Sequence, residues 1–181
     1  MRKIKPRCVV LGVTASIAAY KACDIVRRLR EAGCDVRVVM SPEACELIQP
    51  LVFRVLSGNQ VYQGLFDSPE TWDVEHVSLA EEASLVLIAP ATANCIAKIS
   101  AGICDDMLTC VVAATKAPVL LCPAMNENMY RNRITQENIK RLKSLGYGFI
   151  GPQTGRLACG KVGTGCLSDV DVIVKQALKA L

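Results

Sequence analysis

Short runs of apolar residues alternate along the chain with longer segments in which apolar positions recur every three or four residues. The short runs are rich in Val, Ile and Leu, as expected of buried strands, and they lie at 7–13, 35–40, 84–90, 118–123 and 147–151. Helical spacing follows, at about 17–32, from 42, at 51–56, after 94, within 127–145 and from about 169. Gly33 ends the first predicted helix, and Ser41-Pro42 begins the second as N-cap and first helical residue.

These repeated strand–helix units predict a parallel sheet with right-handed crossovers. Continuously apolar strands need cover on both faces, so we expect a three-layer α/β fold of the Rossmann-like or flavodoxin-like class. The sequence has no internal repeat and no low-complexity tract, and residues 1–181 are predicted to form a single domain.

Composition agrees with this fold and narrows the function classes. Apolar residues make up 51% of the chain but aromatic residues only 4%, which suits a core of Val, Ile, Leu and Ala. The net charge is only +4. The Lys and Arg residues lie at the N-terminus and on predicted helix faces, so no nucleic-acid partner is expected. The apolar stretch 95–115 carries Lys98, Asp105 and Asp106, which are too costly for a membrane span.

The ten cysteines are scattered and form no C-x-x-C pair, and the chain has a single histidine. Such thiols behave as small apolar residues, so we expect a cytoplasmic protein whose cysteines stay reduced and which has no metal site.

Small and hydroxyl-bearing residues follow the first two predicted strands, where open α/β sheets bind ligands. TASIAAYK at 14–21 opens a helix whose backbone N–H groups suit a phosphate. It lacks the G-x-G-x-x-G pattern, and Met40-Ser41 stands where a dinucleotide site needs an acidic residue. A mononucleotide such as FMN, with its phosphate shared between Ser16 and Ser41, fits better. The alternative is that both serines only cap helices.

Two further strand ends carry polar side chains. Thr92 and Asn94 could bond the ribityl chain or the polar edge of a flavin, or could simply cap a turn. Asn126 is likewise a ligand contact or a helix cap. Met125 and Met129 are four residues apart, and we expect Met129 to be a packing residue of its helix.

A Gly-rich segment at 154–167 has no regular apolar period. Long loops in compact domains usually serve function, so we expect a mobile lid there, with Cys159 either catalytic or incidental. His76 follows the polar stretch 67–75. It is either a satisfied core histidine or a proton acceptor that titrates near neutrality.

Several of these segments form a recognisable set: GVTASIAAYK at 12–21, the isolated His76, PATANCIAKISAG at 90–102, PAMNENMY at 123–130 and ACGKVGTG at 158–165. Together they resemble the homo-oligomeric flavin-containing cysteine decarboxylases, in particular the phosphopantothenoylcysteine decarboxylases, over about residues 7–177. The resemblance makes His76 the active-site histidine, Asn126 the substrate-binding asparagine and Cys159 the catalytic cysteine. The FMN contacts that it implies are Ala15, Ser16, Ile17, Ser41, Thr92, Ala93, Asn94, Cys95 and Ala124.

The reaction implied by the resemblance is FMN-dependent decarboxylation of 4'-phospho-N-pantothenoyl-cysteine to 4'-phosphopantetheine in coenzyme A biosynthesis. The substrate would be oxidised transiently to a thioaldehyde, lose carbon dioxide, and be reduced again from the enethiol. His76 would take or stabilise the charge of the substrate thiol, and Cys159 would protonate the substrate carbon. Asn126 would orient the carboxylate without the ground-state stabilisation that a cation gives.

Partners are implied in the same way. The resemblance implies a trimer, or trimers assembled into a dodecamer, with the flavin site between subunits. Many bacterial relatives continue into a fused phosphopantothenate–cysteine ligase domain, so the chain is either a stand-alone enzyme working beside a separate ligase or an excised domain.

The sequence departs from the family where a basic residue and Met usually follow the last Gly of the lid, because Cys166-Leu167 stands there. This leaves the contact to the substrate phosphate unassigned. Alternatives of the same fold are a peptidyl-cysteine decarboxylase, which lacks the reducing cysteine, a flavin prenyltransferase, and a non-enzymatic regulatory flavoprotein. A flavodoxin-like electron carrier would not need His76, Asn126 and Cys159 together.

Overall fold

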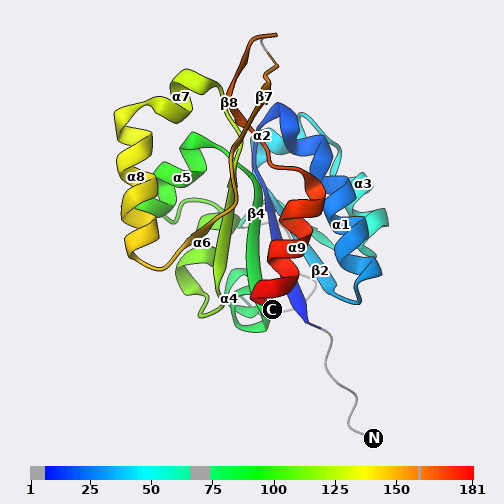
Figure 1. Ribbon diagram of the computed structural model, residues 1–181. Coiled ribbons are helices and arrows are strands. Elements are labelled where there is room, and N and C mark those ends of the chain that lie inside the picture. The colour runs from blue at the N-terminus through cyan, green and yellow to red at the C-terminus, as the bar shows by residue number, and fades with distance from the viewer. Residues whose placement is uncertain (1–6, 66–73, 159) are drawn as a thin grey trace, which may run out of the picture.

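A computed structural model describes residues 7–65, 74–158 and 160–181. Its centre is a six-stranded parallel sheet with strand order β3-β2-β1-β4-β5-β6 (Figure 1). The strands are β1 (Cys8–Val13), β2 (Asp35–Met40), β3 (Val61–Tyr62), β4 (Leu85–Ala91), β5 (Val119–Pro123) and β6 (Gly148–Phe149). The five strands expected from the sequence each begin within one residue of the expected start. The two-residue β3 was not predicted, because a pair of residues carries no period.

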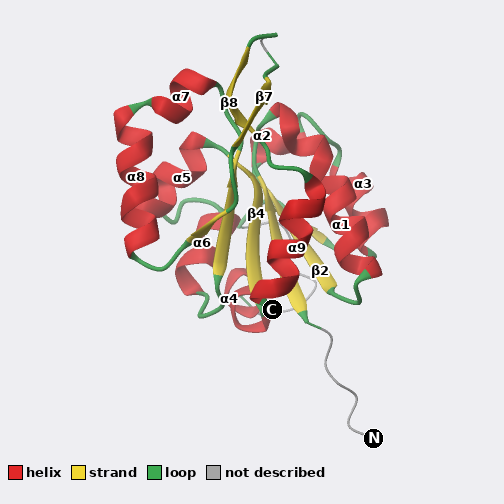
Figure 2. Ribbon diagram, viewed as in Figure 1, coloured by secondary structure: helices red, strands yellow, loops and turns green. Residues whose placement is uncertain are grey.

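Helices cover both faces of this sheet, as Figure 2 shows. One face carries α1 (Lys21–Glu31), α3 (Pro50–Ser57) and α9 (Val170–Ala180). The other carries α4 (Glu75–Glu82), α5 (Ala93–Ala101), α6 (Met107–Ala114) and α8 (Arg133–Ser144). The expected three-layer Rossmann-like arrangement is therefore confirmed.

Successive side chains of the central strands point to opposite faces of the sheet and so contribute to two hydrophobic cores. In β4, Leu85 and Leu87 face the core of α1, α3 and α9, whereas Val86 and Ile88 face the core of the opposite helices. All four side chains are fully buried. Burial of a Leu, Ile or Val side chain stabilises the fold by about 1.5–3 kcal/mol. A strand that is apolar at every position can bury all its side chains only where helices cover both faces of the sheet.

The Gly-rich segment is not the loop that the sequence suggested. Its described residues form an antiparallel hairpin of β7 (Gln153–Arg156) and β8 (Val162–Cys166), which projects beyond the carboxyl ends of the main strands (Figure 1). The expectation of an irregular loop was wrong, because the strand ladder is formed by main-chain hydrogen bonds, for which glycine is no obstacle. Met125 N donates to Gly165 O at 2.9 Å and ties β8 to the end of β5.

Two short helices and a 3₁₀ turn complete the chain at the same end of the sheet. They are η1 (Ile17–Tyr20), α2 (Pro42–Cys45) and α7 (Glu127–Arg131). The first predicted helix therefore begins as a 3₁₀ turn, and regular α-helix starts only at Lys21. Among the described residues, none of the helices is both long and apolar enough to span a membrane.

Candidate functional site

Two adjoining clefts lie at the carboxyl ends of the strands. The larger has a volume of about 730 Å³ and the smaller about 430 Å³, and Ala15, Thr92 and Met129 line both. Their walls come from the segments that directly follow β1, β2, β4 and β5, and the hairpin closes one side of the larger cleft. Both volumes lie in the roughly 300–1,000 Å³ range of small-molecule sites.

All nine residues expected to contact a cofactor line one or both of these clefts. Those on the larger cleft are Ala15, Ser16, Ile17, Thr92, Ala93 and Ala124. Those on the smaller cleft are Ala15, Ser41, Thr92, Asn94 and Cys95. Residues as far apart in the sequence as Ala15 and Ala124 therefore line the same connected space, as the rule for parallel strand ends predicts.

The hydroxyl groups among them are helix caps. Ser16 Oγ accepts from Ala18 N at 3.3 Å, and Ser41 Oγ accepts from Ala44 N at 3.3 Å. Thr92 Oγ1 accepts from Cys95 N at 3.2 Å. All three hydroxyls therefore act as caps, and this does not exclude ligand binding, because each hydroxyl keeps its proton and a second lone pair.

Thr14 is a site residue that the sequence did not single out. Its buried hydroxyl donates to Pro90 O at 2.8 Å and accepts from Thr92 N at 3.0 Å. Thr14 N also donates to Pro90 O at 3.4 Å. These contacts fasten the end of β1 to the end of β4, where the two clefts adjoin. The local sequence could not indicate the role of Thr14, since its hydrogen-bond partners lie more than 70 residues away in the chain.

The segment after β5 forms another wall of the larger cleft. Asn126 caps α7 by accepting from Asn128 N at 2.8 Å, so its carbonyl oxygen is engaged while its amide group has two protons to donate. Met129 was expected to be a packing residue, and this was wrong. The residue is 49% exposed and lines both clefts, because the five-residue α7 has no buried residue of its own.

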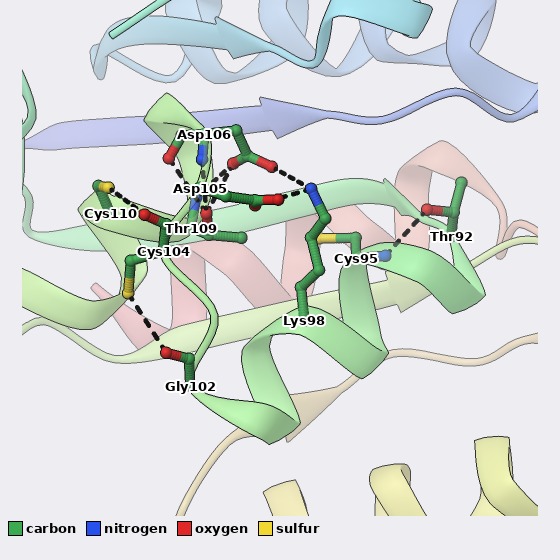
Figure 3. A network of polar contacts seen from close by, with 9 residues as sticks. All are labelled: Thr92, Cys95, Lys98, Gly102, Cys104, Asp105, Asp106, Thr109 and Cys110. Atoms are coloured by element: carbon green, nitrogen blue, oxygen red, sulfur yellow. Dashed lines mark hydrogen bonds and ion pairs between the residues drawn. The ribbon is translucent and has the colours of Figure 1, made fainter.

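An ion-pair network borders the smaller cleft (Figure 3). Lys98 Nζ lies 2.8 Å from Asp105 Oδ1 and 3.0 Å from Asp106 Oδ2. Asp106 also caps α6, because its Oδ1 accepts from Thr109 N at 2.8 Å. The hydrogen bonds that Lys98 donates to the two carboxylates raise its pKa above the usual value, so the ammonium is charged at neutral pH. The network ties α5 to the start of α6.

The thiol of Cys95 lies beside this network and is buried. Burial raises its pKa to about 12, with a smaller contribution from the charge of Asp106. Cys95 is therefore a protonated thiol at neutral pH, which suits packing or a weak hydrogen bond to a ligand rather than nucleophilic attack.

Of the two expected catalytic residues, the structure describes only His76. His76 is the second residue of α4, is partly exposed, and lines neither cleft. Helix α4 packs on α6 and lies at the end of the sheet opposite the β7–β8 hairpin (Figure 1). Cys159 lies outside the described residues, although Ala158 and Gly160 on either side of it line the larger cleft. Among the described residues, no group of three His, Cys, Asp or Glu side chains could hold a metal ion.

The model of the Flavoprotein family matches residues 1–181. The coenzyme A biosynthesis bifunctional protein CoaBC of Haemophilus influenzae is 42% identical over 171 residues, which are 94% of this chain and 43% of that protein. The chain thus spans less than half the length of this curated relative. A solved structure of a PPC decarboxylase mutant complexed with pantothenoylaminoethenethiol superposes with a TM-score of 0.86 at 27% identity, over 97% of this chain and 98% of the other. The FMN-dependent cysteine decarboxylase SpaF gives a TM-score of 0.83 at 29% identity, over 97% of each chain.

Proposed function

The chain belongs to the Flavoprotein family, and we propose that it binds FMN and decarboxylates 4'-phospho-N-pantothenoyl-cysteine to 4'-phosphopantetheine in coenzyme A biosynthesis. One observation carries the proposal: all nine expected FMN contacts and Asn126 surround the same pair of adjoining clefts. Similarity to CoaBC and to a PPC decarboxylase supports this substrate over other cysteine-containing ones.

The clefts have the chemistry that FMN requires. Capping hydroxyls and the N-terminus of the nine-residue α5 offer hydrogen bonds to a phosphate or a hydroxylated chain. The small side chains of Ala15, Ala93 and Ala124 leave room for close approach of a flat ring, and Met129 offers it an apolar contact. We propose that Ser16 and Ser41 share the phosphate.

Bound FMN supplies a reversible two-electron acceptor, and the chain's own residues supply binding and proton transfer. Asn126 donates its amide N–H groups to the substrate carboxylate. Since this donor is neutral, it orients the carboxylate without stabilising its charge, and the barrier to losing carbon dioxide is not raised. The His76 imidazole takes the proton from the substrate sulfur, and Cys159 Sγ returns a proton to the substrate carbon.

The proposed role of His76 implies an oligomer. Because His76 lines neither cleft of its own subunit, it can act on the substrate thiol only from a second copy of the chain. A trimer, or trimers assembled into a dodecamer, would bring the α4 of one subunit to the clefts of another. The proposal covers the decarboxylation alone. A phosphopantothenate–cysteine ligase, the proposed partner, would make the substrate.

The test is direct. The purified protein is expected to bind FMN with a shifted flavin absorption spectrum, and to release carbon dioxide and phosphopantetheine from phosphopantothenoylcysteine. Accumulation of an enethiol as the end product would instead indicate the peptidyl-cysteine decarboxylase type of reaction. Absence of FMN binding would contradict the whole proposal.

The role of His76 has its own test. His76→Asn is expected to abolish turnover while FMN affinity stays at the wild-type value, because the residue acts on the substrate thiol. Mixing this variant with subunits of an Asn126→Asp variant should restore part of the activity if the histidine acts across subunits. Unchanged turnover of His76→Asn alone would make the residue a packing histidine.

A further inference from the structure

The two adjoining clefts have opposite charge. Among the described residues that line the larger cleft, the ionisable cations are Lys21 and Arg156, and there is no Asp or Glu. The smaller cleft is lined by Glu43, Asp105 and Asp106 against the single cation Lys98. Charges with low-dielectric walls focus their field into a cleft, so the larger cleft attracts an anion more strongly than the smaller one does.

The two cations come from separate elements. Lys21 is the first residue of α1, and Arg156 is the last residue of β7, paired with Val162 of β8. Neither side chain forms an ion pair with a carboxylate among the residues that the structure describes, whereas Lys98 is held by two. The positive charge of the larger cleft is thus not neutralised by the described part of the chain.

We propose that Arg156, assisted by Lys21, binds the phosphate of the substrate in the larger cleft. This inference rests on the proposed function, which gives the substrate two anionic groups, a carboxylate at the reacting end and a phosphate at the other. A cation on the carboxylate would stabilise the charge that the reaction must remove. A cation on the phosphate stabilises ground and transition states equally, and its binding energy positions the reacting end.

The residue type suits this role. The guanidinium presents N–H donors in a planar fork that matches two phosphate oxygens, whereas an ammonium acts as a point charge. Arg156 is also fixed at its backbone, since its carbonyl accepts from Cys166 Sγ at 3.4 Å, and Leu157 N donates to Lys161 O at 2.8 Å in the turn that follows. Cys166, where the family usually carries a basic residue, is therefore next to the arginine that supplies the charge.

A matched control is available on the same hairpin. Lys161 is exposed at the hairpin turn but does not line the larger cleft. Removing its charge changes the net charge of the hairpin as much as Arg156→Gln does. Arg156→Lys, the conservative variant, keeps the charge but loses the fork.

The experiment compares ligands with and without the phosphate. With FMN-loaded protein, calorimetric titration of 4'-phosphopantothenate and of pantothenate gives the phosphate preference of each variant, independently of turnover. Arg156→Gln is expected to weaken phosphopantothenate binding roughly 10- to 100-fold, the loss typical of a hydrogen bond to a charged group, and to leave pantothenate binding unchanged. Arg156→Lys should recover part of the loss, and Lys161→Gln should change neither affinity by more than about twofold.

Turnover of phosphopantothenoylcysteine and of its dephosphorylated form separates this inference from the proposed function. If Arg156→Gln loses the phosphate preference of the wild type but the wild type does not decarboxylate the substrate, the inference stands and the proposed function is wrong. An active protein in which Arg156→Gln affects both ligands equally would do the reverse. A loss of FMN affinity in Arg156→Gln would mean that the arginine serves the cofactor, and would overturn the inference.

Discussion

The hydroxyl of Thr14 joins β1 to β4 at the point where the two clefts adjoin, and its removal gives the sharpest test of how the site is built. Thr14→Val keeps the shape of the side chain but cannot donate to Pro90 O or accept from Thr92 N. Pro90 O retains the Thr14 N–H at 3.4 Å, so one of its two bonds survives. Thr92 N–H loses its partner.

Each lost hydrogen bond contributes roughly 0.5–1.5 kcal/mol net, so Thr14→Val should lower the free energy of unfolding by roughly 1–3 kcal/mol. Thr14→Ser keeps both bonds and removes one methyl group, which costs about 0.8 kcal/mol. Urea denaturation of the flavin-free proteins measures these differences, because ligand binding would otherwise add to the apparent stability.

Thr115 provides the matched control. Its hydroxyl also bridges two main-chain groups, donating to Ala80 O at 2.9 Å and accepting from Ala117 N at 3.1 Å, but it lines neither cleft. Thr115→Val should therefore lose a similar stability and keep the wild-type FMN affinity, whereas Thr14→Val should lose both. If Thr14→Val is as stable as Thr14→Ser, or binds FMN as tightly as Thr115→Val, the hydroxyl does not organise the site.

Three further outcomes are expected. Gly151→Ala should lower the free energy of unfolding by about 1–3 kcal/mol, because the residue has a φ of +79° and a new Cβ would lie 2.1 Å from Ser168 Oγ; a urea midpoint equal to the wild type would refute this. Although burial opposes ionisation of Asp106, its hydrogen bonds to Thr109 and Lys98 hold its pKa below the usual 3.8. Its ionisation therefore stabilises the fold above about pH 3.8, and this contribution is lost as the pH falls through the lower folded-state value. Denaturation across pH 2–6 should show a smaller acid loss for Asp106→Asn, and parallel curves would contradict it. Cys159→Ser is expected to release carbon dioxide but to accumulate the enethiol, seen by mass spectrometry, and normal product at the wild-type rate would remove the cysteine from the mechanism.

Local patterns determined much of this protein. Short continuous runs of Val, Ile and Leu that alternate with helical segments favour buried parallel strands, so most strand positions and the layer order followed from the sequence. Helix caps such as Ser41 and Thr92 were also readable, since a cap depends on a side chain and an N–H two or three residues away. The rule that ligands bind beyond parallel strand ends also predicted that the expected cofactor contacts would lie near one another, and all of them line the two clefts.

Only the tertiary structure decided features that depend on distant partners. The Gly-rich segment became a hairpin because two strands supply each other's main-chain hydrogen bonds, which leaves no mark in side-chain periodicity. Met129 proved exposed because α7 is too short to bury a face. The bridging role of Thr14 and the separation of His76 from the clefts also depend on segments far apart in sequence. The sequence alone determined which strand ends carry hydroxyl and amide side chains, because residue type and local spacing set that, and the resemblance to a known family completed the list of expected flavin contacts. Which of them share a cleft, and with what charge, was decided only by folding, because it depends on how distant segments meet in space.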